Sequence, residues 1–467
     1  MSDVLSRLAS KQAESIEAQK PEESKGSSLV NLACKRPLEP ETLEGLGLPA
    51  AFIEELILKL LDLRGAMTEH EISWHIKVPK MIVSQVCKDL AKRKLIGPSP
   101  SNPQAYICGS EGKERAEDAN RTSRYIGPMP VPVEEYVSLM RVQVGRPLEF
   151  DQKDIENAYS KIVMYDKEFR DRIGPAVRSQ RSILLYGAPG NGKTIMGKCL
   201  TALMKSDLLI PYALFAYGQI IKLFDSSVHK PIIPDEYKPY DLDETDKVKY
   251  DMRWVPIKVP YVEVATEFTL DGFELSYNEY AKFYEMATHI KANGGVFFID
   301  DFGRQIGKAE DYLNRLITPL QSREDILKMS ATGGQIRVPF YCIPLFSTNF
   351  TLDRIGDEAF LRRFKYKILA KSPNEENLRD IFKFESMRTG IEYDDAMYEY
   401  FLEKLKKRGA KLRSCLANDI ISKIVDHCKF HNLTPTMKSK ELMDLAFELN
   451  FSEQTETWEF GTKEDKR

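Results

Sequence analysis

The chain has few cysteines and none of the spacings in which cysteines usually act together. Seven cysteines are spread over 467 residues, and no two of them form a C-x-x-C pair. An odd count without paired spacings excludes a zinc ribbon and argues against a disulfide framework. Free cysteines of this kind are typical of a reducing compartment, so we expect a cytoplasmic protein.

Long apolar runs are also missing. Residues 1–28 contain no apolar segment of the secretory type, and no apolar run reaches the roughly 18 residues that a membrane-spanning helix needs. We therefore expect no signal peptide and no membrane insertion. Hydrophobic residues still make up 42% of the chain. The length predicts about two to four domains, each with a core of its own.

The chain lacks an excess of charge of one sign. It has 67 basic and 70 acidic residues and a net charge of −3, which excludes a polycation that binds nucleic acid over its whole surface. Positive charge gathers only locally. The helix predicted over Pro79–Leu95 carries five basic residues against one acidic residue, a local charge of +4. The basic residues are Lys80, Lys88, Lys92, Arg93 and Lys94.

The N-terminal part divides into two segments. Residues 1–46 are rich in Glu, Lys, Ser and Pro, and we expect a disordered lead there. Residues 47–123 contain apolar residues at helical spacing in Ala50–Gly65, then Thr68 three residues before Glu71, which is a capping-box pattern. The helix from Pro79 follows, and then a short strand and a glycine-containing turn in Tyr106–Ala116. This order predicts an α+β domain that resembles a winged helix.

The basic helix of this domain allows two interpretations. It could enter the major groove of DNA with its lysines on phosphates. Alternatively, its charges form a solvated face and the domain binds a protein. The sequence shows no arginine-rich wing and no aromatic residues interleaved with the basic ones. We therefore favour a protein partner and keep DNA as a possible one.

Prolines mark the next boundary. Pro128, Pro130 and Pro132 occupy every second position, which predicts a stiff, extended linker over residues 124–136. Residues 137–371 alternate helical patterns with apolar strands, and residues 372–467 read as helices followed by a tail. The chain therefore belongs to the α/β class, with a parallel sheet and a helical C-terminal part.

A glycine-rich loop carries the strongest chemical pattern. Residues 187–194 fit G-x-x-x-x-G-K-[ST] at every position, between a predicted strand at Ser182–Tyr186 and a helix that begins near Lys193. Backbone N–H groups of such a loop face a β-phosphate, and the helix N-terminus adds positive potential. Lys193 would reach the β- and γ-phosphates, and Thr194 would place its hydroxyl on Mg²⁺. The nucleotide-binding residues are thus Gly187, Ala188, Pro189, Gly190, Asn191, Gly192, Lys193 and Thr194.

Two acids complete the predicted site. Val296–Ile299 is a continuous apolar run suited to a buried parallel strand, and it ends in Asp300 and Asp301. Asp300 is predicted to hold the Mg²⁺ shell. Asp301 is predicted to polarise the attacking water as a catalytic base.

Together these motifs resemble the AAA+ ATPases, and in particular the MoxR-like branch of bacteria, over about Val137–Phe451. The resemblance implies a P-loop AAA+ parallel-sheet core with a C-terminal α-helical lid, preceded here by the winged-helix-like domain. It also implies ATP as the substrate, Mg²⁺ as the cofactor, and a homo-oligomeric ring, expected to be a hexamer.

The resemblance assigns further residues. Asn349, within Phe340–Phe350, matches the polar sensor 1 beside the γ-phosphate, and Arg363 matches the arginine finger that acts on ATP of a neighbouring subunit. Arg362 is the less favoured finger. The Gly-Ala-x-x-Arg spacing points to Arg413 as sensor 2.

The chain departs from the family pattern at two places. The second acid is commonly Glu, whereas this chain has the shorter Asp301, so we expect modest hydrolysis. Lids of this type often carry Pro-Arg-Asp where Ala417-Asn418-Asp419 stands.

Two segments resemble the inserts of MoxR-like ATPases. Phe273–Glu285 lies where those proteins carry a helix-2 insert, and Ile326–Phe340 has a glycine pair that predicts a hairpin. Tyr277, Tyr280 and Phe283 either contact a client or pack a small core, and the second is favoured for any one of them. Pro211–Tyr237 reads as the second strand and a long loop, with His229 as an ordinary loop residue.

The favoured function is an ATPase that hydrolyses ATP at subunit interfaces of a ring and remodels or assembles a partner protein, as a chaperone does. The alternative is a DNA-associated AAA+ ATPase: an initiator, a helicase loader or a transcription regulator. It is weakened because initiators usually carry their winged helix after the ATPase. A third possibility, a switch that binds ATP and barely hydrolyses it, is disfavoured by the lysine, both acids and the arginine finger.

Overall fold

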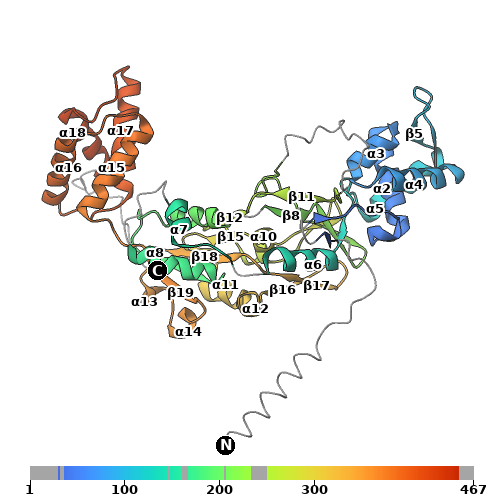
Figure 1. The fold of residues 1–467 in the computed structure, drawn as a ribbon, viewed down its shortest axis with the longest axis horizontal. Helices are drawn as coiled ribbons and strands as arrows, with labels where there is room; N and C mark the ends of the chain where they lie inside the picture. Colours follow the sequence, from blue (N-terminus) through green and yellow to red (C-terminus); the bar gives the residue numbers. More distant parts are fainter. Residues whose placement is uncertain are drawn as a thin grey trace, which may run out of the picture.

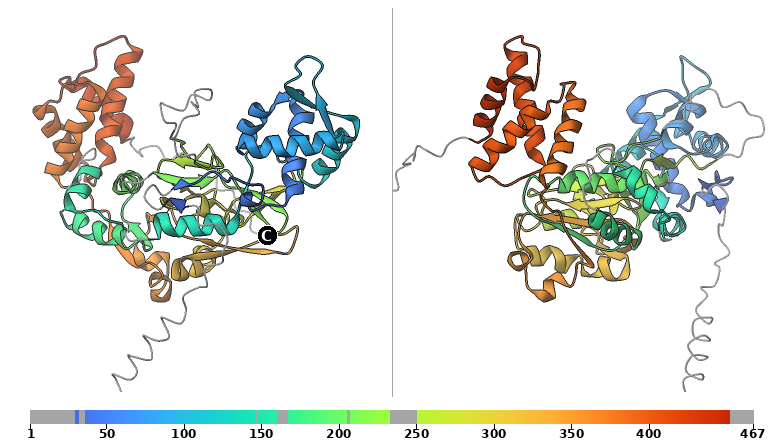
Figure 2. Two further views of the ribbon diagram at one scale, coloured as in Figure 1. Left: turned by 45° about the vertical axis from the view of Figure 1, so that its right-hand side comes forward. Right: turned by 60° about the vertical axis from the view of Figure 1, so that its left-hand side comes forward.

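A computed structural model describes residues 30–31, 36–145, 148–159, 167–204, 207–232 and 250–451. A central α/β unit lies between an N-terminal unit and a C-terminal helical unit, which stand at opposite ends of it (Figures 1 and 2). Residues 1–29 of the expected lead fall outside the described residues. In the described ranges, no helix is both long and apolar enough to cross a membrane.

The central sheet has five parallel strands in the order β12, β15, β18, β7, β19. Strand β7 comes first in the sequence, but in the sheet it lies between β18 and β19, the two strands that come last in the sequence. Because all five strands are parallel, the loops that follow them meet at one edge of the sheet. The strands are β7 (Ile183–Tyr186), β12 (Tyr261–Val264), β15 (Val296–Ile299), β18 (Ile343–Thr348) and β19 (Tyr366–Leu369).

Both faces of this sheet are covered, which explains why its inner strands β7 and β15 are continuously apolar. Side chains alternate between faces, so Val296 and Phe298 pack in one cluster and Phe297 and Ile299 in another. The first cluster is covered by helices. They are α7 (Gln152–Ala158), α8 (Lys167–Arg178), α9 (Lys193–Cys199) and the 3₁₀ helix η2 (Leu200–Leu203).

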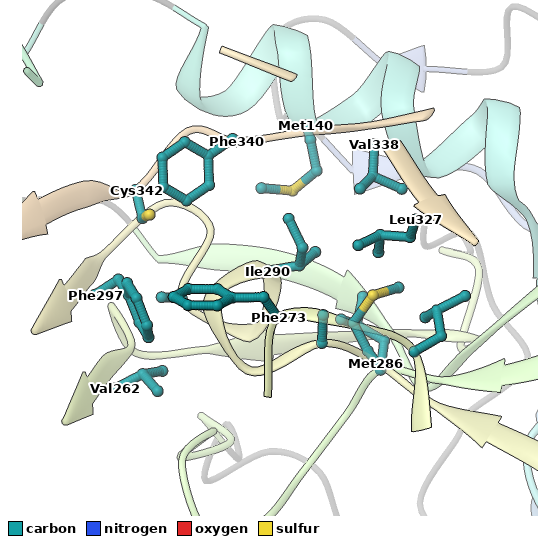
Figure 3. Close-up of a cluster of buried hydrophobic side chains, with 14 of the residues drawn as sticks. Met140, Val262, Phe273, Met286, Ile290, Phe297, Leu327, Val338, Phe340 and Cys342 are labelled. Atoms are coloured by element: carbon teal, nitrogen blue, oxygen red, sulfur yellow. The ribbon is translucent and has the colours of Figure 1, made fainter. Parts of the chain in front are cut away.

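The second cluster joins the sheet to several elements (Figure 3). Phe297 of β15 shares it with Met140 of α6 and Ile290 of α10. Two further short helices and a 3₁₀ helix also contribute residues to it. The bounds are α6 (Val133–Val144), α10 (Thr288–Lys291), α11 (Ala309–Arg315), α12 (Ile317–Ser322) and the 3₁₀ helix η3 (Leu270–Phe273).

The predicted hairpin in Ile326–Phe340 is confirmed. Strands β16 (Glu324–Lys328) and β17 (Gln335–Pro339) pair antiparallel around a turn that contains Gly333 at φ +71°. Leu327 and Val338 from its two strands are buried in the cluster of Figure 3. The hairpin is thus packed against the body of the unit along its length.

A second sheet occupies the region where one strand and a long loop were expected, so that expectation was wrong. Tyr217 and Gly218 both have positive φ (50° and 73°) and form a tight turn that pairs two strands. The second strand of the central sheet is instead β12. The elements involved are β8 (Leu208–Pro211), β9 (Ala213–Ala216), β10 (Gln219–Lys222), β11 (Trp254–Ile257), β13 (Ser276–Asn278) and β14 (Phe283–Glu285). The sheet order is β13, β14, β10, β9 and β6 (Val131–Pro132), and β8 pairs with β11.

The structure also differs from the stiff, extended linker that was predicted for the proline-rich segment 124–136. Its strand β6 (Val131–Pro132) pairs in parallel with β9, and Met129 and Val131 are fully buried. Pro132 is tolerated because β6 is the edge strand of the second sheet, where a missing N–H costs no ladder bond. The segment is therefore part of a sheet and not a free spacer.

The N-terminal unit has helices and a three-stranded antiparallel sheet in the order β3, β5, β4. The capping box is confirmed, because Thr68 N–H donates to Glu71 Oε2 (2.7 Å) and Glu71 N–H to Thr68 Oγ1 (3.3 Å). The expected turn after the strand is wrong, since Gly109 precedes a helix. The elements are α2 (Ala50–Arg64), β3 (Met67–Thr68), α3 (Glu69–Ile76), α4 (Lys80–Lys92), β4 (Ile96–Pro98), β5 (Ala105–Cys108) and α5 (Ser110–Thr122).

The described end of the expected disordered lead is folded. Strands β1 (Val30–Asn31) and β2 (Arg36–Pro37) pair, and a 3₁₀ helix η1 (Glu44–Leu46) follows. Leu46 is buried, and its carbonyl accepts a hydrogen bond from Arg253 Nη1 at 2.9 Å. Arg253 is itself buried and pairs with Asp251 at 2.8 Å. This junction fixes the end of the lead to the central unit.

The C-terminal unit is a bundle with its own buried core. It follows β19 and the short helices α13 (Leu352–Ile355) and α14 (Glu358–Leu361). Its helices are α15 (Glu375–Thr389), α16 (Asp395–Lys407), α17 (Cys415–Phe430) and α18 (Lys440–Asn450). Because its apolar residues face one another, it contacts the central unit mainly through connecting segments.

Candidate nucleotide-binding site

The glycine-rich loop connects β7 to α9 with three glycines at positive φ. Gly187, Gly190 and Gly192 have φ of 144°, 80° and 76°, which L-residues with a side chain rarely adopt. A Cβ at Gly187 would lie 2.5 Å from the carbonyl oxygen of Ala370. The loop is therefore shaped by backbone conformations and close approaches that only glycine allows.

Lys193 places its amine inside this loop. Its Nζ donates to the carbonyl oxygens of Gly187 (2.9 Å) and Ala188 (3.1 Å) and to Asn349 Oδ1 (2.7 Å), and the residue is 7% exposed. Burial lowers the pKa of Lys193, and the nearby carboxylates of Asp300 and Asp301 oppose this shift. The Lys193 ammonium group is thus held close to the carboxylates of Asp300 and Asp301.

Thr194 and Asp300 bring two oxygen donors together. Thr194 Oγ1 donates to Asp300 Oδ2 at 2.7 Å, while Asp300 Oδ1 accepts from the Asp301 N–H (2.9 Å) and from Ser347 Oγ. A hydroxyl and a carboxylate are hard oxygen ligands of the kind that Mg²⁺ binds beside phosphates. The donor set at this place therefore fits Mg²⁺.

Asp301 has a different environment from its neighbour. Its φ of +48° is unusual for a residue with a side chain, and such strain concentrates at functional sites. Asn349 Nδ2 donates to Asp301 Oδ1. Gln305 Nε2 donates to the carbonyl oxygens of Asp300 (2.9 Å) and Asp301 (3.4 Å) and so holds the turn.

The central sheet brings these side chains together. Lys193 follows β7, Asp300 and Asp301 follow β15, and Asn349 follows β18, which lies between those two strands. Ser347 and Gln305 were not identified from the sequence. Ser347 could have been noticed as a polar residue inside an apolar strand, because a buried hydroxyl needs a partner.

The two arginines lie just after α14 and differ in their contacts. Arg362 Nη2 pairs with Glu358 Oε1 at 2.8 Å on the surface. Within the described ranges, the guanidinium of Arg363 forms no ion pair or hydrogen bond, although the backbone carbonyl of Arg363 accepts from Ser182 Oγ (2.8 Å). No recorded contact brings either side chain to the glycine-rich loop of the same chain.

Arg413 belongs to a segment that touches the loop. The N–H of Cys415 donates to the carbonyl oxygen of Gly190 at 2.9 Å, and a Cβ at Gly190 would lie 3.8 Å from Arg413 Cβ. The Arg413 side chain is exposed and makes no hydrogen bond within the part of the chain that the structure describes. The segment thus presents an unpaired arginine beside the loop.

The aromatic residues of the predicted insert do not share one small core. Phe283 packs edge-on against Tyr125 of the N-terminal unit with ring centroids 5.7 Å apart, and Tyr277 packs against Tyr284. Tyr280 is 77% exposed, with the Arg124 guanidinium 4.2 Å from its ring. The insert therefore forms a hairpin, β13–β14, against which the N-terminal unit docks.

His229 is buried and structural, as its ring contacts show. Its Nδ1 accepts from the Asp225 N–H (3.0 Å) and its Nε2 lies 2.8 Å from the Lys291 carbonyl oxygen. Burial lowers the pKa of His229. The described residues contain no group of three or more His, Cys, Asp or Glu side chains arranged to hold a metal ion.

Comparisons with known proteins add little to this geometry. A family described as a domain of unknown function, DUF8689, matches residues 374–449, which is the C-terminal unit alone. No curated protein matches the chain.

Two of the solved structures that match the chain are described here by their overlap with it. The RuvB Holliday junction branch migration motor of Thermotoga maritima is 12% identical over 65% of this chain and 72% of its own, with a TM-score of 0.34. NtrX from Brucella abortus in complex with ATP is 13% identical over 62% of this chain, with a TM-score of 0.35. The match spans 57% of the NtrX chain.

Proposed function

We propose that the chain is an AAA+ ATPase of the MoxR-like branch that hydrolyses ATP with Mg²⁺. One observation carries the proposal: Lys193, Thr194, Asp300, Asp301 and Asn349, from three separate segments, converge at the carboxyl ends of β7, β15 and β18. A lysine in a glycine-rich loop, a hydroxyl beside a carboxylate, and a second carboxylate with an amide partner are the parts that phosphoryl transfer to water requires.

Each side chain then has a distinct task. Lys193 exchanges its contacts with the Gly187 and Ala188 carbonyls for β- and γ-phosphate oxygens. Thr194 and Asp300 would hold Mg²⁺, which would supply positive charge against the phosphates when bound. Asp301 takes a proton from the attacking water, and Asn349 fixes the direction of the Asp301 carboxylate.

The arginines extend the proposal to a ring. The unpaired guanidinium of Arg363 is the proposed finger for ATP in a neighbouring subunit, with Arg362 as the alternative, and Arg413 is the proposed sensor 2 above its own loop. Subunits would therefore share sites, which favours a closed ring, a hexamer in this proposal. Residues 137–371 form the ATPase core, residues 372–467 the lid and tail, and the winged-helix-like unit of residues 47–123 recruits a client protein for remodelling or assembly.

Steady-state ATP hydrolysis by the full chain tests the proposal. Lys193→Ala should lower turnover by about a hundredfold or more, because it removes the cation that faces the transferred phosphate. Lys198→Ala is the matched control, since Lys198 lies on the same helix but pairs with Glu263 on the surface. Wild-type turnover in Lys193→Ala would contradict an ATPase site here.

A DNA-associated ATPase is the second candidate, supported by the basic charge of α4. Lys80 and Lys88 of this helix are exposed beside Met81, which is also exposed. Contacts of such lysines with phosphates would be sensitive to salt. Strong stimulation of ATP hydrolysis by duplex DNA, together with salt-sensitive binding, would replace the protein client by DNA.

A further inference from the structure

Asn191 links the glycine-rich loop to the segment that leads into the C-terminal unit. It is 1% exposed, and its Nδ2 donates to the carbonyl oxygen of Ala370 and to Ser372 Oγ, both at 3.2 Å. Ala370 and Ser372 lie between β19 and α15. The Asn191 amide thus links the glycine-rich loop to the segment between β19 and α15. This segment connects the C-terminal unit to the central sheet.

Two neighbouring glycines tighten the same contact. Gly187 lies against the Ala370 carbonyl, and the Gly190 carbonyl accepts a hydrogen bond from the N–H of Cys415, the first residue of α17. A Cβ at Gly190 would lie 2.6 Å from Cys415 Sγ. The outer side of the loop therefore touches the C-terminal unit and its connection, while its inner side holds the Lys193 amine.

The Asn191 side chain is only half satisfied. Its Oδ1 is buried and has no hydrogen-bond partner among the described residues, whereas its Nδ2 has two acceptors. A buried amide oxygen without a partner is unfavourable. The Asn191 amide therefore holds the loop to residues 370–372 through its donor while its acceptor stays unused.

We propose that Asn191 is a positioning residue that transmits nucleotide occupancy of the loop to the C-terminal unit. The inference rests on the proposed ATPase function. When phosphates replace the Gly187 and Ala188 carbonyls around Lys193, the loop backbone adjusts. The Asn191 amide carries this adjustment to Ser372, and the C-terminal unit with Arg413 changes its position over the site.

Hydrogen exchange of the full chain, with and without a non-hydrolysable ATP analogue, tests the coupling together with ATPase kinetics. In the wild type, the analogue should slow exchange in residues 187–194 and change it in residues 370–373 and 413–416. Asn191→Asp keeps the size of the side chain but removes the donor, and Asn191→Ala removes both. Ser372→Ala removes only the acceptor on the connection and leaves the loop intact.

Ser372→Ala lies outside the nucleotide-binding loop, so it should keep protection of residues 187–194 and an unchanged KM while the response at residues 413–416 disappears. The two Asn191 variants should lose the same remote response. The kcat of all three variants should fall about fivefold to tenfold, the rate equivalent of one lost hydrogen bond. A merely structural role would lower stability without removing the remote response. Variants that bind, respond and turn over as the wild type overturn the coupling alone. A wild-type chain that binds no nucleotide overturns the proposed function, and the coupling falls with it.

Discussion

At the residue scale, the two adjacent acids are separated by their partners and not by their sequence positions. Asp300 accepts from Thr194 and Ser347 and faces the proposed metal position. Asp301 is turned away by its positive φ and is held by Asn349. One carboxylate is therefore fixed beside the loop hydroxyl, while the other carries an amide partner that can direct it at a water molecule.

This difference predicts the behaviour of Asp301→Asn. The variant keeps the size of the side chain and an oxygen that can accept from Asn349, but it cannot take a proton. Nucleotide binding should be retained, and turnover should fall by about a hundredfold or more, as expected when a general base is lost. Binding is measured with a fluorescent ATP analogue and turnover by phosphate release.

Asp171→Asn provides the control, because Asp171 is an exposed carboxylate on α8, away from the loop. It should change neither quantity. Turnover that stays at the wild-type level in Asp301→Asn would remove the base assignment and leave only a structural part for this carboxylate.

At the element scale, the N-terminal unit contains a lysine that is buried between its helices. Lys59 of α2 is 3% exposed, and its Nζ donates to the carbonyl oxygen of Ser123 at 2.9 Å. Burial lowers its pKa to about 8. Helix α5, which ends beside this lysine, buries Gly112, Ala116 and Ala119. A helix that buries small residues lacks the strong apolar periodicity by which helices are recognised from sequence.

The shifted pKa of Lys59 predicts how the stability of this unit depends on pH. Between pH 8 and about 10.5, the unfolded state binds the proton that the folded state has lost, so the free energy of unfolding rises with pH. Below pH 8 the buried charge destabilises the fold by up to about 3 kcal/mol. Lys59→Met removes this buried charge and its destabilising effect, so the stability advantage of the variant over the wild type should shrink as pH rises.

Urea unfolding followed by tryptophan fluorescence measures this difference, since Trp74 lies in the same unit. Lys77, whose pKa is also lowered to about 8, is present in both proteins and cancels from the comparison. Parallel stability curves for wild type and Lys59→Met across this pH range would show that the Lys59 amine titrates normally.

Elements built from neighbouring residues were predictable, and elements built from distant ones were not. The strand, loop and helix around residues 187–194 and the hairpin β16–β17 follow from local turn and cap residues. The second sheet joins β6, β9 and β14, strands of two to four residues that lie far apart in the chain. Such short strands carry no periodicity of their own. Their partners therefore become visible only when the chain is folded, and for this reason the prolines of residues 124–136 predict a stiff, extended linker and not a strand.

At the scale of the whole molecule, the two outer units are attached in different ways. The N-terminal unit is fixed by buried Arg253 and by the β13–β14 hairpin, where Lys282 Nζ donates to the Arg121 carbonyl at 2.6 Å. The C-terminal unit contacts the glycine-rich loop through Asn191 and Cys415. Nucleotide-dependent movement is thus expected of the C-terminal unit, with the N-terminal unit carried along as part of the central body.

The unpaired Arg363 leads to a prediction about assembly. Because the guanidinium forms no hydrogen bond or ion pair with the loop of its own chain within the described ranges, we expect it to act on ATP bound by a neighbour. Arg363→Ala should then be inactive alone while still binding nucleotide. Lys193→Ala should also be inactive alone, but it keeps the intact guanidinium of Arg363. Mixing them should restore activity, since a Lys193→Ala subunit can supply its arginine to the intact loop of an Arg363→Ala subunit.

Random mixing at equal concentrations should restore about a quarter of the wild-type rate, because one interface in four combines an intact loop with an intact finger. Arg362→Ala is the matched control: Arg362 is paired with Glu358, so this variant should remain active. If the mixture stays inactive although both variants assemble, Arg363 does not act between subunits. If Arg362→Ala is the inactive one and Arg363→Ala turns over normally, the finger is Arg362, and its ion pair with Glu358 must open when subunits meet.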